Sequence, residues 1–432
     1  MFWQKDEETM PRSELESLQL ARLKRLVDYV HTNVPFYRKR LDEASVTSDK
    51  IKTLSDIKYI PLTTKEDIRD NYPYGLFAKP MKKIVRIHAS SGTTGKPTVV
   101  GYTQNDIDMW SDLVARLTMA AGATDDDIVH IAFGYGLFTG ALGLHYGLER
   151  IGATVVPTSS GNTERNIMLM RDFGTTALVS TPSYAMYIAE TAREMGINPK
   201  DLKIRLGLFG SEGCSDEFRR KIEDTWGLFA TDNYGMSELI GPGVSGECIY
   251  RCGMHFAEDH FLPEIINPDT GEVLPRGETG ELVITTLTKE GIPLLRYRTK
   301  DITSISYDTC ECGRTHARMA RTHGRSDDML KIKGVNVFPT QIESVLISIP
   351  QVGSNYQIVL DTVNYMDTFV INIELSDGSL LERYSELEGL QQTIRQKLRS
   401  TLGLDAKINL VEPKSLQRSA GKAVRVVDNR KR

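Results

Sequence analysis

Residues 84–98, with the sequence IVRIHASSGTTGKPT, decide the fold assignment. The first five residues have the β-branched pattern of a strand. The segment that follows is rich in glycine and hydroxyl side chains, which let backbone N–H groups turn toward an anion, and it contains a lysine that adds a positive charge. The spacing differs from GxxxxGK[ST], which excludes a Walker A loop. We therefore predict a phosphate-binding loop, with an ordinary flexible turn as the alternative; its residues are Ser90, Ser91, Gly92, Thr93, Thr94, Gly95 and Lys96.

Downstream of this loop, short β-branched runs alternate with helical stretches. The candidate strands are DIVHIAF (127–133), ATVVP (153–157), TALVS (176–180) and IRLGLF (204–209), and the candidate helices cover 104–121 and 183–195. Such alternation predicts an α/β domain with a largely parallel sheet. Upstream, apolar residues at helical spacing predict a helix near 14–31, where Ser13 and Glu16 have the spacing of a capping box.

The remainder of the chain indicates two further parts. Residues 281–287 (ELVITTL) and 302–306 are strand-like and predict a β-rich subdomain. After Gly324 a smaller unit follows, with expected helices at 340–349 and 386–402 and expected strands at 355–360, 368–375 and 407–412. We predict an α/β fold with a large N-terminal domain of mixed and parallel sheets plus a β-rich subdomain (1–325), and a small α+β C-terminal domain (326–432).

Composition excludes several classes of function. The 432 residues are 40% hydrophobic and 25% charged, with a formal net charge of −4, which is ordinary for a soluble globular protein. Nothing indicates a nucleic-acid-binding or membrane-binding patch, a signal peptide or a membrane span. Five cysteines in so long a chain do not resemble a disulfide framework. We expect a cytoplasmic protein without nucleic-acid or membrane partners.

Five further sequence blocks carry polar groups suited to nucleotide chemistry. They are FGSEG (209–213), DNYGMSE (232–238), YRTKD (297–301), GRSDDMLKIKGVNVFPTQIE (324–343) and SAGKAVRV (419–426). Together with the phosphate loop, and in the same order, they resemble the signature motifs of the adenylate-forming superfamily. The YRTKD and GVNVFP wording resembles the phenylacetate-CoA ligase branch of that superfamily. The resemblance covers nearly the whole chain, from the N-terminal helix to Lys422.

The resemblance implies a nucleotide site. The loop would hold the β- and γ-phosphates of ATP, Tyr234 would lie against the adenine, and Asp301 and Arg325 would contact the ribose. Ser237 would meet the α-phosphate and Glu238 would hold Mg²⁺, a hard cation that prefers oxygen ligands. The other residues implied to line the nucleotide site are Ser211, Glu212, Asp232, Asn233, Gly235 and Met236.

The same resemblance implies a catalytic lysine and a hinge. Lys422 would stabilise the negative charge that builds at the α-phosphate when a carboxylate attacks it. Asp327 would be the hinge about which the C-terminal domain turns. Asn336 stands where many superfamily members have arginine, so their contact with coenzyme A is not expected here.

A substrate pocket is expected along AFGYGLFTG (132–140), which resembles the acyl pocket of the phenylacetate branch. Tyr135 is the first candidate to face an aryl ring, followed by Phe138, with Gly136 beside them. An aryl pocket should be apolar with a few orienting donors. Phe133, on the preceding strand, is expected to belong to the core.

Four cysteines form two clusters, ECIYRCGMH and CECGRTH, which resemble the ligand pairs of a structural zinc site. By the family resemblance, the expected ligands are Cys248, His255, Cys310 and Cys312. Cys252 competes with His255 for the fourth position, and buried free thiols are the alternative.

The leading hypothesis is an AMP-forming ligase that joins phenylacetate or a similar small aryl carboxylic acid to coenzyme A. Its cofactors would be ATP, coenzyme A, Mg²⁺ and a structural Zn²⁺, and the resemblance suggests a homodimer. One alternative is an adenylate-forming ligase without coenzyme A, of the kind that transfers AMP to a deazaflavin. The other is a catalytically silent binding protein of the same fold.

Overall fold

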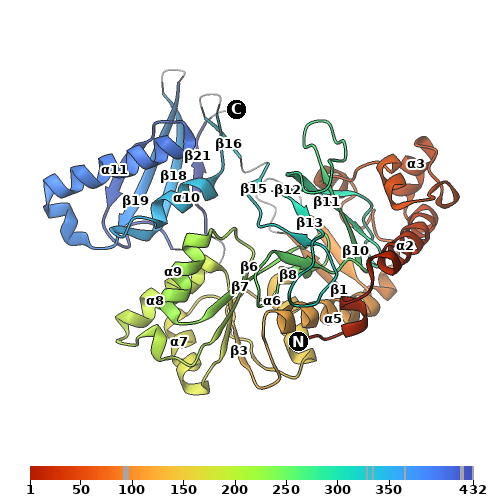
Figure 1. Ribbon diagram of the computed structural model, residues 1–432, viewed down its shortest axis with the longest axis horizontal. Coiled ribbons are helices and arrows are strands. Elements are labelled where there is room, and N and C mark those ends of the chain that lie inside the picture. Colours follow the sequence, from red (N-terminus) through yellow and green to blue (C-terminus); the bar gives the residue numbers. More distant parts are fainter. Residues whose placement is uncertain (91–96, 327–328, 333–334, 364–365, 419–422, 431–432) are drawn as a thin grey trace.

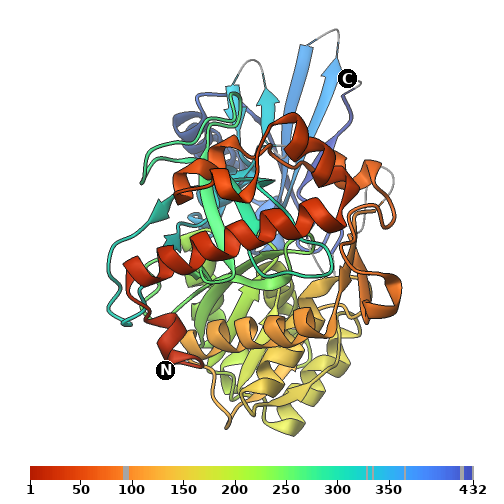
Figure 2. The same ribbon diagram turned by 90° about the vertical axis from the view of Figure 1, so that its right-hand side faces the viewer.

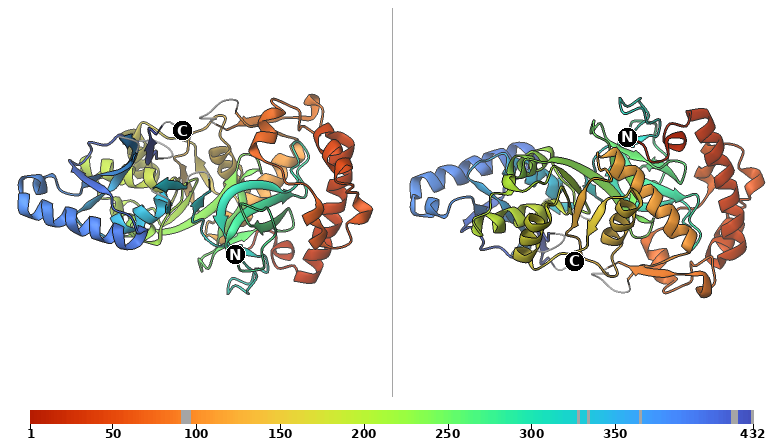
Figure 3. Two further views of the ribbon diagram at one scale, coloured as in Figure 1. Left: turned by 90° about the horizontal axis from the view of Figure 1, so that it is seen from above. Right: turned by 90° about the horizontal axis from the view of Figure 1, so that it is seen from below.

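The computed structural model describes residues 1–90, 97–326, 329–332, 335–363, 366–418 and 423–430. The C-terminal unit lies at one end of the molecule, above helices α7 (Thr163–Phe173), α8 (Pro182–Glu194) and α9 (Asp216–Trp226) (Figure 1). The N-terminal helices α2 (Arg12–Asn33) and α3 (Pro35–Glu43) lie at the opposite end (Figure 3).

The centre of the described chain is a nine-stranded mixed sheet with the order β13-β14-β9-β8-β7-β6-β5-β3-β4. The strands from β4 to β7 are parallel, and those from β8 onward pair antiparallel. Their bounds are β3 (Ile128–Ile131), β4 (Thr154–Val156), β5 (Ala177–Ser180), β6 (Leu206–Gly210), β7 (Phe229–Met236), β8 (Gly241–Glu247), β9 (Met254–Phe256), β13 (Ile305–Ser306) and β14 (Arg318–Met319). The buried runs of β5 and β6 are what a parallel sheet covered on both faces requires.

Helices α5 (Gln104–Ala120) and α6 (Thr139–Arg150) pack together beside β8. Two glycines of α6 make this approach possible. A Cβ on Gly143 would lie 2.4 Å from the Trp110 ring, and one on Gly147 would lie 2.3 Å from Val114. Larger residues at either position would force the two helices apart.

A second sheet holds β10 (Phe261–Ile266), β11 (Gly280–Thr286), β12 (Tyr297–Thr303) and β15 (Gly324–Arg325) in that order. Helix α2 runs obliquely across this side of the molecule (Figure 2). Strands β1 (Arg86–Ala89) and β2 (Val99–Tyr102) pair antiparallel, and the predicted phosphate loop follows β1 and precedes β2 in the chain. The shorter helices of this region are α1 (Lys5–Glu8) and α4 (Lys65–Asp70).

The C-terminal unit has its own apolar core. Its four-stranded sheet has the order β20-β19-β18-β21, and helices α10 and α11 pack on it. The bounds are α10 (Pro339–Ile347), β18 (Val352–Val363), β19 (Met366–Leu375), α11 (Tyr384–Leu402), β20 (Lys407–Val411) and β21 (Val426–Asp428), preceded by the ribbon of β16 (Leu330–Ile332) and β17 (Val335–Val337).

The predicted elements agree with these bounds to within a few residues, with two differences. The capping box at Ser13 and Glu16 is wrong, because α2 begins at Arg12 after Pro11 and no side chain caps it. Proline supplies the fixed φ that a helix start favours. Strand β7, on which Asp232 to Met236 lie, was not among the predicted strands. Among the described helices, none combines the length and apolarity that crossing a bilayer requires.

Candidate active site and cysteine cluster

The two ends of the predicted phosphate loop are fastened to each other. The Ser90 backbone N–H donates to Thr98 O at 3.0 Å, and the Thr98 N–H donates to Ser90 Oγ at 3.1 Å. The two hydroxyls also lie within 2.7 Å of each other. Of the predicted loop residues, Ser90 is placed here; Ser91, Gly92, Thr93, Thr94, Gly95 and Lys96 lie outside the described residues.

Glu238 joins the base of this loop from the far end of the DNYGMSE block. Its carboxylate accepts a hydrogen bond from Thr98 Oγ1 at 3.1 Å and lies 3.7 Å from Lys65 Nζ, and the residue is only 3% exposed. Lys289 Nζ donates to the Glu238 carbonyl at 2.9 Å. Burial lowers the pKa of Lys289 to about 8, while Asp106 and Glu238 oppose that shift. The fold thus places a carboxylate and hydroxyl groups together, a donor set suited to Mg²⁺.

Tyr234, Asp301 and Arg325 form the next part of the site. Tyr234 on β7 donates its phenolic hydrogen to Asp301 Oδ2 at 2.5 Å. Asp301 on β12 faces Arg325 on β15 directly across the strand pair, with Arg325 Nη1 3.8 Å from Asp301 Oδ1. Burial and the neighbouring Asp301 raise the pKa of Tyr234 well above its usual value, so the phenol stays a donor. The family resemblance implied one nucleotide site for these three residues, and in the structure they lie in contact with one another.

The FGSEG block turns sharply where β6 ends. Ser211 has a φ of 71°, a left-handed conformation that serine rarely adopts. Glu212 accepts hydrogen bonds from the backbone N–H of Ser183 at 3.2 Å and of Ala423 at 2.5 Å. Asn233 on β7 donates to the Phe209 carbonyl at 2.5 Å. These groups therefore lie at the carboxyl ends of neighbouring parallel strands, where open α/β sheets bind ligands.

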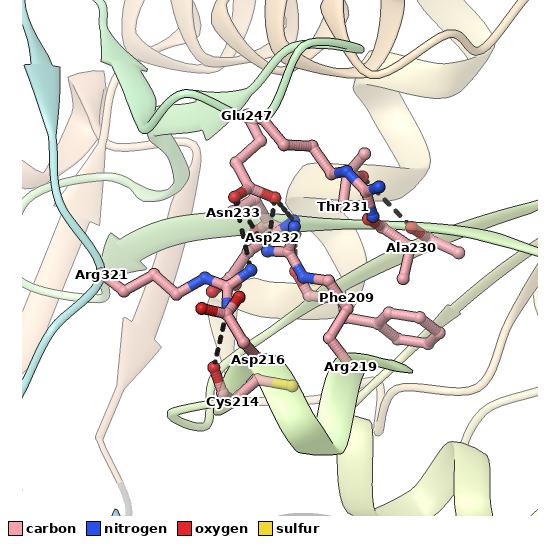
Figure 4. A network of polar contacts seen from close by, with 12 residues as sticks. Phe209, Cys214, Asp216, Arg219, Ala230, Thr231, Asp232, Asn233, Glu247 and Arg321 are labelled. Carbon is pink, nitrogen blue, oxygen red and sulfur yellow. Dashed lines mark hydrogen bonds and ion pairs between the residues drawn. The ribbon is translucent and has the colours of Figure 1, made fainter. Parts of the chain in front are cut away.

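Asp232 lies beside a buried ionic network that the sequence did not indicate (Figure 4). Arg219 donates to Glu247 at 2.7 and 2.8 Å, and Glu247 also accepts the Asp232 backbone N–H at 2.8 Å. Arg321 reaches this group from the β14–β15 connection, 2.6 Å from Asp216 and 3.7 Å from Glu247. Burial raises the pKa of Asp232 to about 7, with Glu247 adding to the rise.

The predicted acyl segment follows β3 and contacts β1. The Ala89 N–H donates to Leu137 O at 3.1 Å. Tyr135 is half-buried and its OH lies 3.0 Å from His145 Nδ1, whose other nitrogen is 3.0 Å from Glu149. Phe138 is 53% exposed, and Gly136 has a φ of 137°, which favours glycine.

Ser237 lies next to this acyl segment. Its hydroxyl is 3.2 Å from that of Thr139, the first residue of α6. The segment expected to hold the acid and the serine expected to meet the α-phosphate are therefore neighbours. Phe133 packs against the main core, as expected.

The four predicted metal ligands converge. The ligand atoms of Cys248, His255, Cys310 and Cys312 all lie within 4.8 Å of one another. Cys252 is exposed and its sulfur contacts the Tyr250 carbonyl instead. The cluster lies where β8 and β9 meet the turn before β14, since His255 pairs with Gly246 on one side and Arg318 on the other.

Three further predictions fall outside what the structure describes. Lys422 and Asp327 lie outside the described residues, and the side chain of Asn336 is not described. Ala423, which follows Lys422 in the chain, is described and contacts Glu212.

Comparisons with known proteins find relatives of this chain over its full length. The chain matches the family described as AMP-binding enzyme over residues 18–288 and the AMP-binding enzyme C-terminal domain over 334–430. It is 48% identical to a phenylacetate-coenzyme A ligase of Thermus thermophilus, with 100% of each chain covered. It is 47% identical to phenylacetate-coenzyme A ligases of Aromatoleum evansii (98% of this chain, 96% of that one) and Escherichia coli (98% and 97%).

Among solved structures, 2-hydroxyisobutyryl-CoA ligase is similar in two states. In its postadenylation state with 2-HIB-AMP, the TM-score is 0.93 at 28% identity, covering 98% of this chain and 92% of that one. In its thioesterification state with 2-HIB-AMP and CoA, the TM-score is 0.74 at 29% identity, covering 99% and 92%. The arrangement of the two units here is thus closer to the postadenylation state.

Proposed function

The chain belongs to the AMP-binding enzyme family, and on that premise we propose that it ligates phenylacetate or a similar aryl carboxylic acid to coenzyme A. The reaction proceeds through an acyl-adenylate and releases pyrophosphate and AMP. The observation that carries the proposal is that Ser90 and Glu238 both bond to Thr98, while Ser237, next to Glu238 in the chain, contacts Thr139 beside the acyl segment. Sequence identity of 47–48% to several phenylacetate-CoA ligases, over 98–100% of this chain, supports it.

In the first half-reaction, the carboxylate of the acid attacks the α-phosphate of ATP and displaces pyrophosphate. Tyr234 and Asp301 hold the adenosine, and the loop after Ser90 holds the phosphates that leave. Lys422 stabilises the charge that develops on the α-phosphate oxygens. No residue of the chain needs to act as a nucleophile, because the substrate carboxylate supplies that group.

Glu238 is the residue that would hold Mg²⁺, and Ser237 would meet the α-phosphate. The buried carboxylate beside a cluster of hydroxyl oxygens fits a hard divalent cation. When bound, the ion neutralises phosphate charge and orients the triphosphate.

In the second half-reaction, the thiol of coenzyme A attacks the acyl carbonyl and displaces AMP. We place the boundary between residues 325 and 326, with Asp327 as the hinge about which 326–432 turns. Hinge rotation of this kind would bring the C-terminal domain over the active site in a second arrangement. The contacts with coenzyme A do not include an arginine at position 336, where the chain has Asn336.

The cysteine cluster is proposed to hold a structural Zn²⁺. Tetrahedral zinc with ligand bonds of about 2.0–2.3 Å places two sulfurs about 3.8 Å apart and a sulfur and a nitrogen about 3.6 Å apart. Cys248 Sγ and Cys310 Sγ are 3.7 Å apart, and Cys312 Sγ and His255 Nε2 are 3.4 Å apart. A closed set of four protein ligands indicates a structural ion without a chemical role.

The decisive experiment follows pyrophosphate release with MgATP across a panel of aryl and short aliphatic acids, with and without coenzyme A. The proposal expects release with phenylacetate or a near relative, an increase on adding coenzyme A, and accumulation of AMP with the thioester. Release without any response to coenzyme A would favour adenylation for another acceptor. No release with any acid would refute the ligase assignment and favour a binding protein.

A further inference from the structure

Helix α8 presents one side to the C-terminal unit. Ser183 and Glu190, two helical turns apart, both contact that unit. Residues separated by seven positions lie on the same helix face. Because Ser183 also donates its backbone N–H to Glu212, the start of α8, the FGSEG block and the C-terminal unit meet at one place.

Glu190 contacts two segments of the C-terminal unit at once. Its Oε1 accepts the Ser354 hydroxyl of β18 at 2.8 Å, and its Oε2 is 3.5 Å from Arg418 Nη2. Arg418 is itself held by Glu374 of β19, with both guanidinium nitrogens bonded at 2.6 and 2.8 Å. Glu190 therefore connects α8 to a segment that is already fixed within its own unit.

The residues after 419–422 are tied to the same region. Ala423 donates its N–H to Glu212, and Arg425 Nη2 donates to the Ser183 hydroxyl at 3.3 Å. Arg425 also lies over the Tyr356 ring, 4.6 Å from its centroid. Arg418 on one side of the segment and Ala423 on the other are thus each bonded to a carboxylate of the large domain.

We propose that Glu190 is a positioning residue for the adenylate-forming half-reaction, acting with Glu212 to hold both flanks of the segment that contains Lys422. The inference rests on the proposed function, because it assumes that Lys422 serves adenylate formation. These contacts belong to the arrangement that resembles the postadenylation state, with a TM-score of 0.93 against 0.74 for the thioesterification state. Glu190 should therefore matter for one half-reaction and not for the other.

The test measures the two half-reactions separately in Glu190→Ala. Adenylate formation is followed by pyrophosphate release in a single turnover, and thioester formation starts from supplied phenylacetyl-adenylate and coenzyme A. Losing one charged and one hydroxyl contact should slow adenylate formation about tenfold. Thioester formation should stay within about twofold. Because Glu374 still pairs with Arg418, the C-terminal unit should remain folded.

The matched control is Glu194→Ala. Glu194 lies one turn further along α8 and pairs with Lys414, but both side chains are half-exposed. Exposed pairs contribute little, so both half-reactions should stay within about twofold. Equal slowing of both half-reactions in Glu190→Ala, unchanged adenylate formation, or the same loss in Glu194→Ala would overturn the inference.

A second readout needs no substrate and separates this inference from the proposed function. Tryptic cleavage after Arg418, identified by mass spectrometry, should be several-fold faster in Glu190→Ala than in the wild type or Glu194→Ala. Unchanged cleavage would contradict the proposed role of Glu190 in holding Arg418, even if the wild type proved to be a ligase. Faster cleavage in a protein that forms no adenylate would support the role of Glu190 in holding Arg418 and would refute only the proposed ligase function.

Discussion

Replacing Asp232 by asparagine should make the stability of the protein less dependent on pH. Asp232 lies beside Glu247, which already takes Arg219 in a two-bond pair and has Arg321 nearby (Figure 4). Burial, and then the negative charge of Glu247, raise the pKa of the Asp232 carboxyl from 3.8 to about 7, although both arginines act in the opposite direction. The folded protein therefore favours the neutral acid at this position.

The sign of the effect follows from proton linkage. A carboxyl whose pKa is higher in the folded state stabilises the fold when it is protonated, and this contribution is lost as pH rises from about 4 through about 7. A rise of about three pKa units corresponds to about 4 kcal/mol, or about 1.4 kcal/mol per pH unit. Asparagine cannot ionise, so the Asp232→Asn variant should gain up to this amount relative to the wild type between pH 4 and pH 7.5.

Urea unfolding at half-unit steps from pH 4.5 to pH 8 measures this difference directly. The difference in unfolding free energy between variant and wild type should rise steadily and level off above about pH 7.5. Glu343 on α10, whose pKa burial also raises to about 7, offers a matched comparison. Glu343→Gln should change in the same direction. Parallel pH curves for the wild type and Asp232→Asn would refute the assigned protonation of Asp232.

Three further outcomes test the proposed site. Tyr234→Phe, which removes the bond to Asp301, should raise the KM for ATP about tenfold with little change in kcat, measured by pyrophosphate release. Cys310→Ser should abolish the bound zinc found by elemental analysis and lower the unfolding temperature by about 5–10 °C, whereas Cys252→Ser, outside the cluster, should change neither. Lys422→Ala should lose adenylate formation and retain thioester formation from supplied aryl-adenylate; unchanged adenylate formation would contradict its proposed role.

The parts of the fold that the sequence predicted are those with local signals. The strands at 177–180 and 206–210 are buried on both faces, so they give the short apolar runs by which parallel strands are found. Strand β7 was harder to predict from the sequence, because its buried residues include polar side chains such as Asn233, which bonds to the Phe209 carbonyl. Its local composition therefore indicates a loop.

In the candidate site, too, some residues could be predicted from the sequence and others could not. The motif residues were found because their types and order resemble a family, but their partners were not. Glu247, Arg219 and Arg321 are far apart in the sequence and follow no periodic pattern. They come together through the packing of α9 against β7, the register of β7 against β8 and the position of the chain after β14. Sequence alone gives no signal for such a network.

The polar contacts between the two units bear on how the enzyme would change state. Ser344 donates to Glu217 at 2.9 Å and Thr340 donates to the His323 carbonyl at 2.8 Å, in addition to the contacts of Glu190. Groups of this kind can exchange a protein partner for water at small net cost, whereas an apolar contact such as that of Ile347 on α10 with the core of the large domain would lose its burial on opening. Because the C-terminal unit has its own apolar core, we expect it to turn as a rigid body in the proposed hinge motion. We therefore expect only a small free-energy difference between the two proposed arrangements, so that removing the Glu190 carboxylate on α8 should slow adenylate formation selectively.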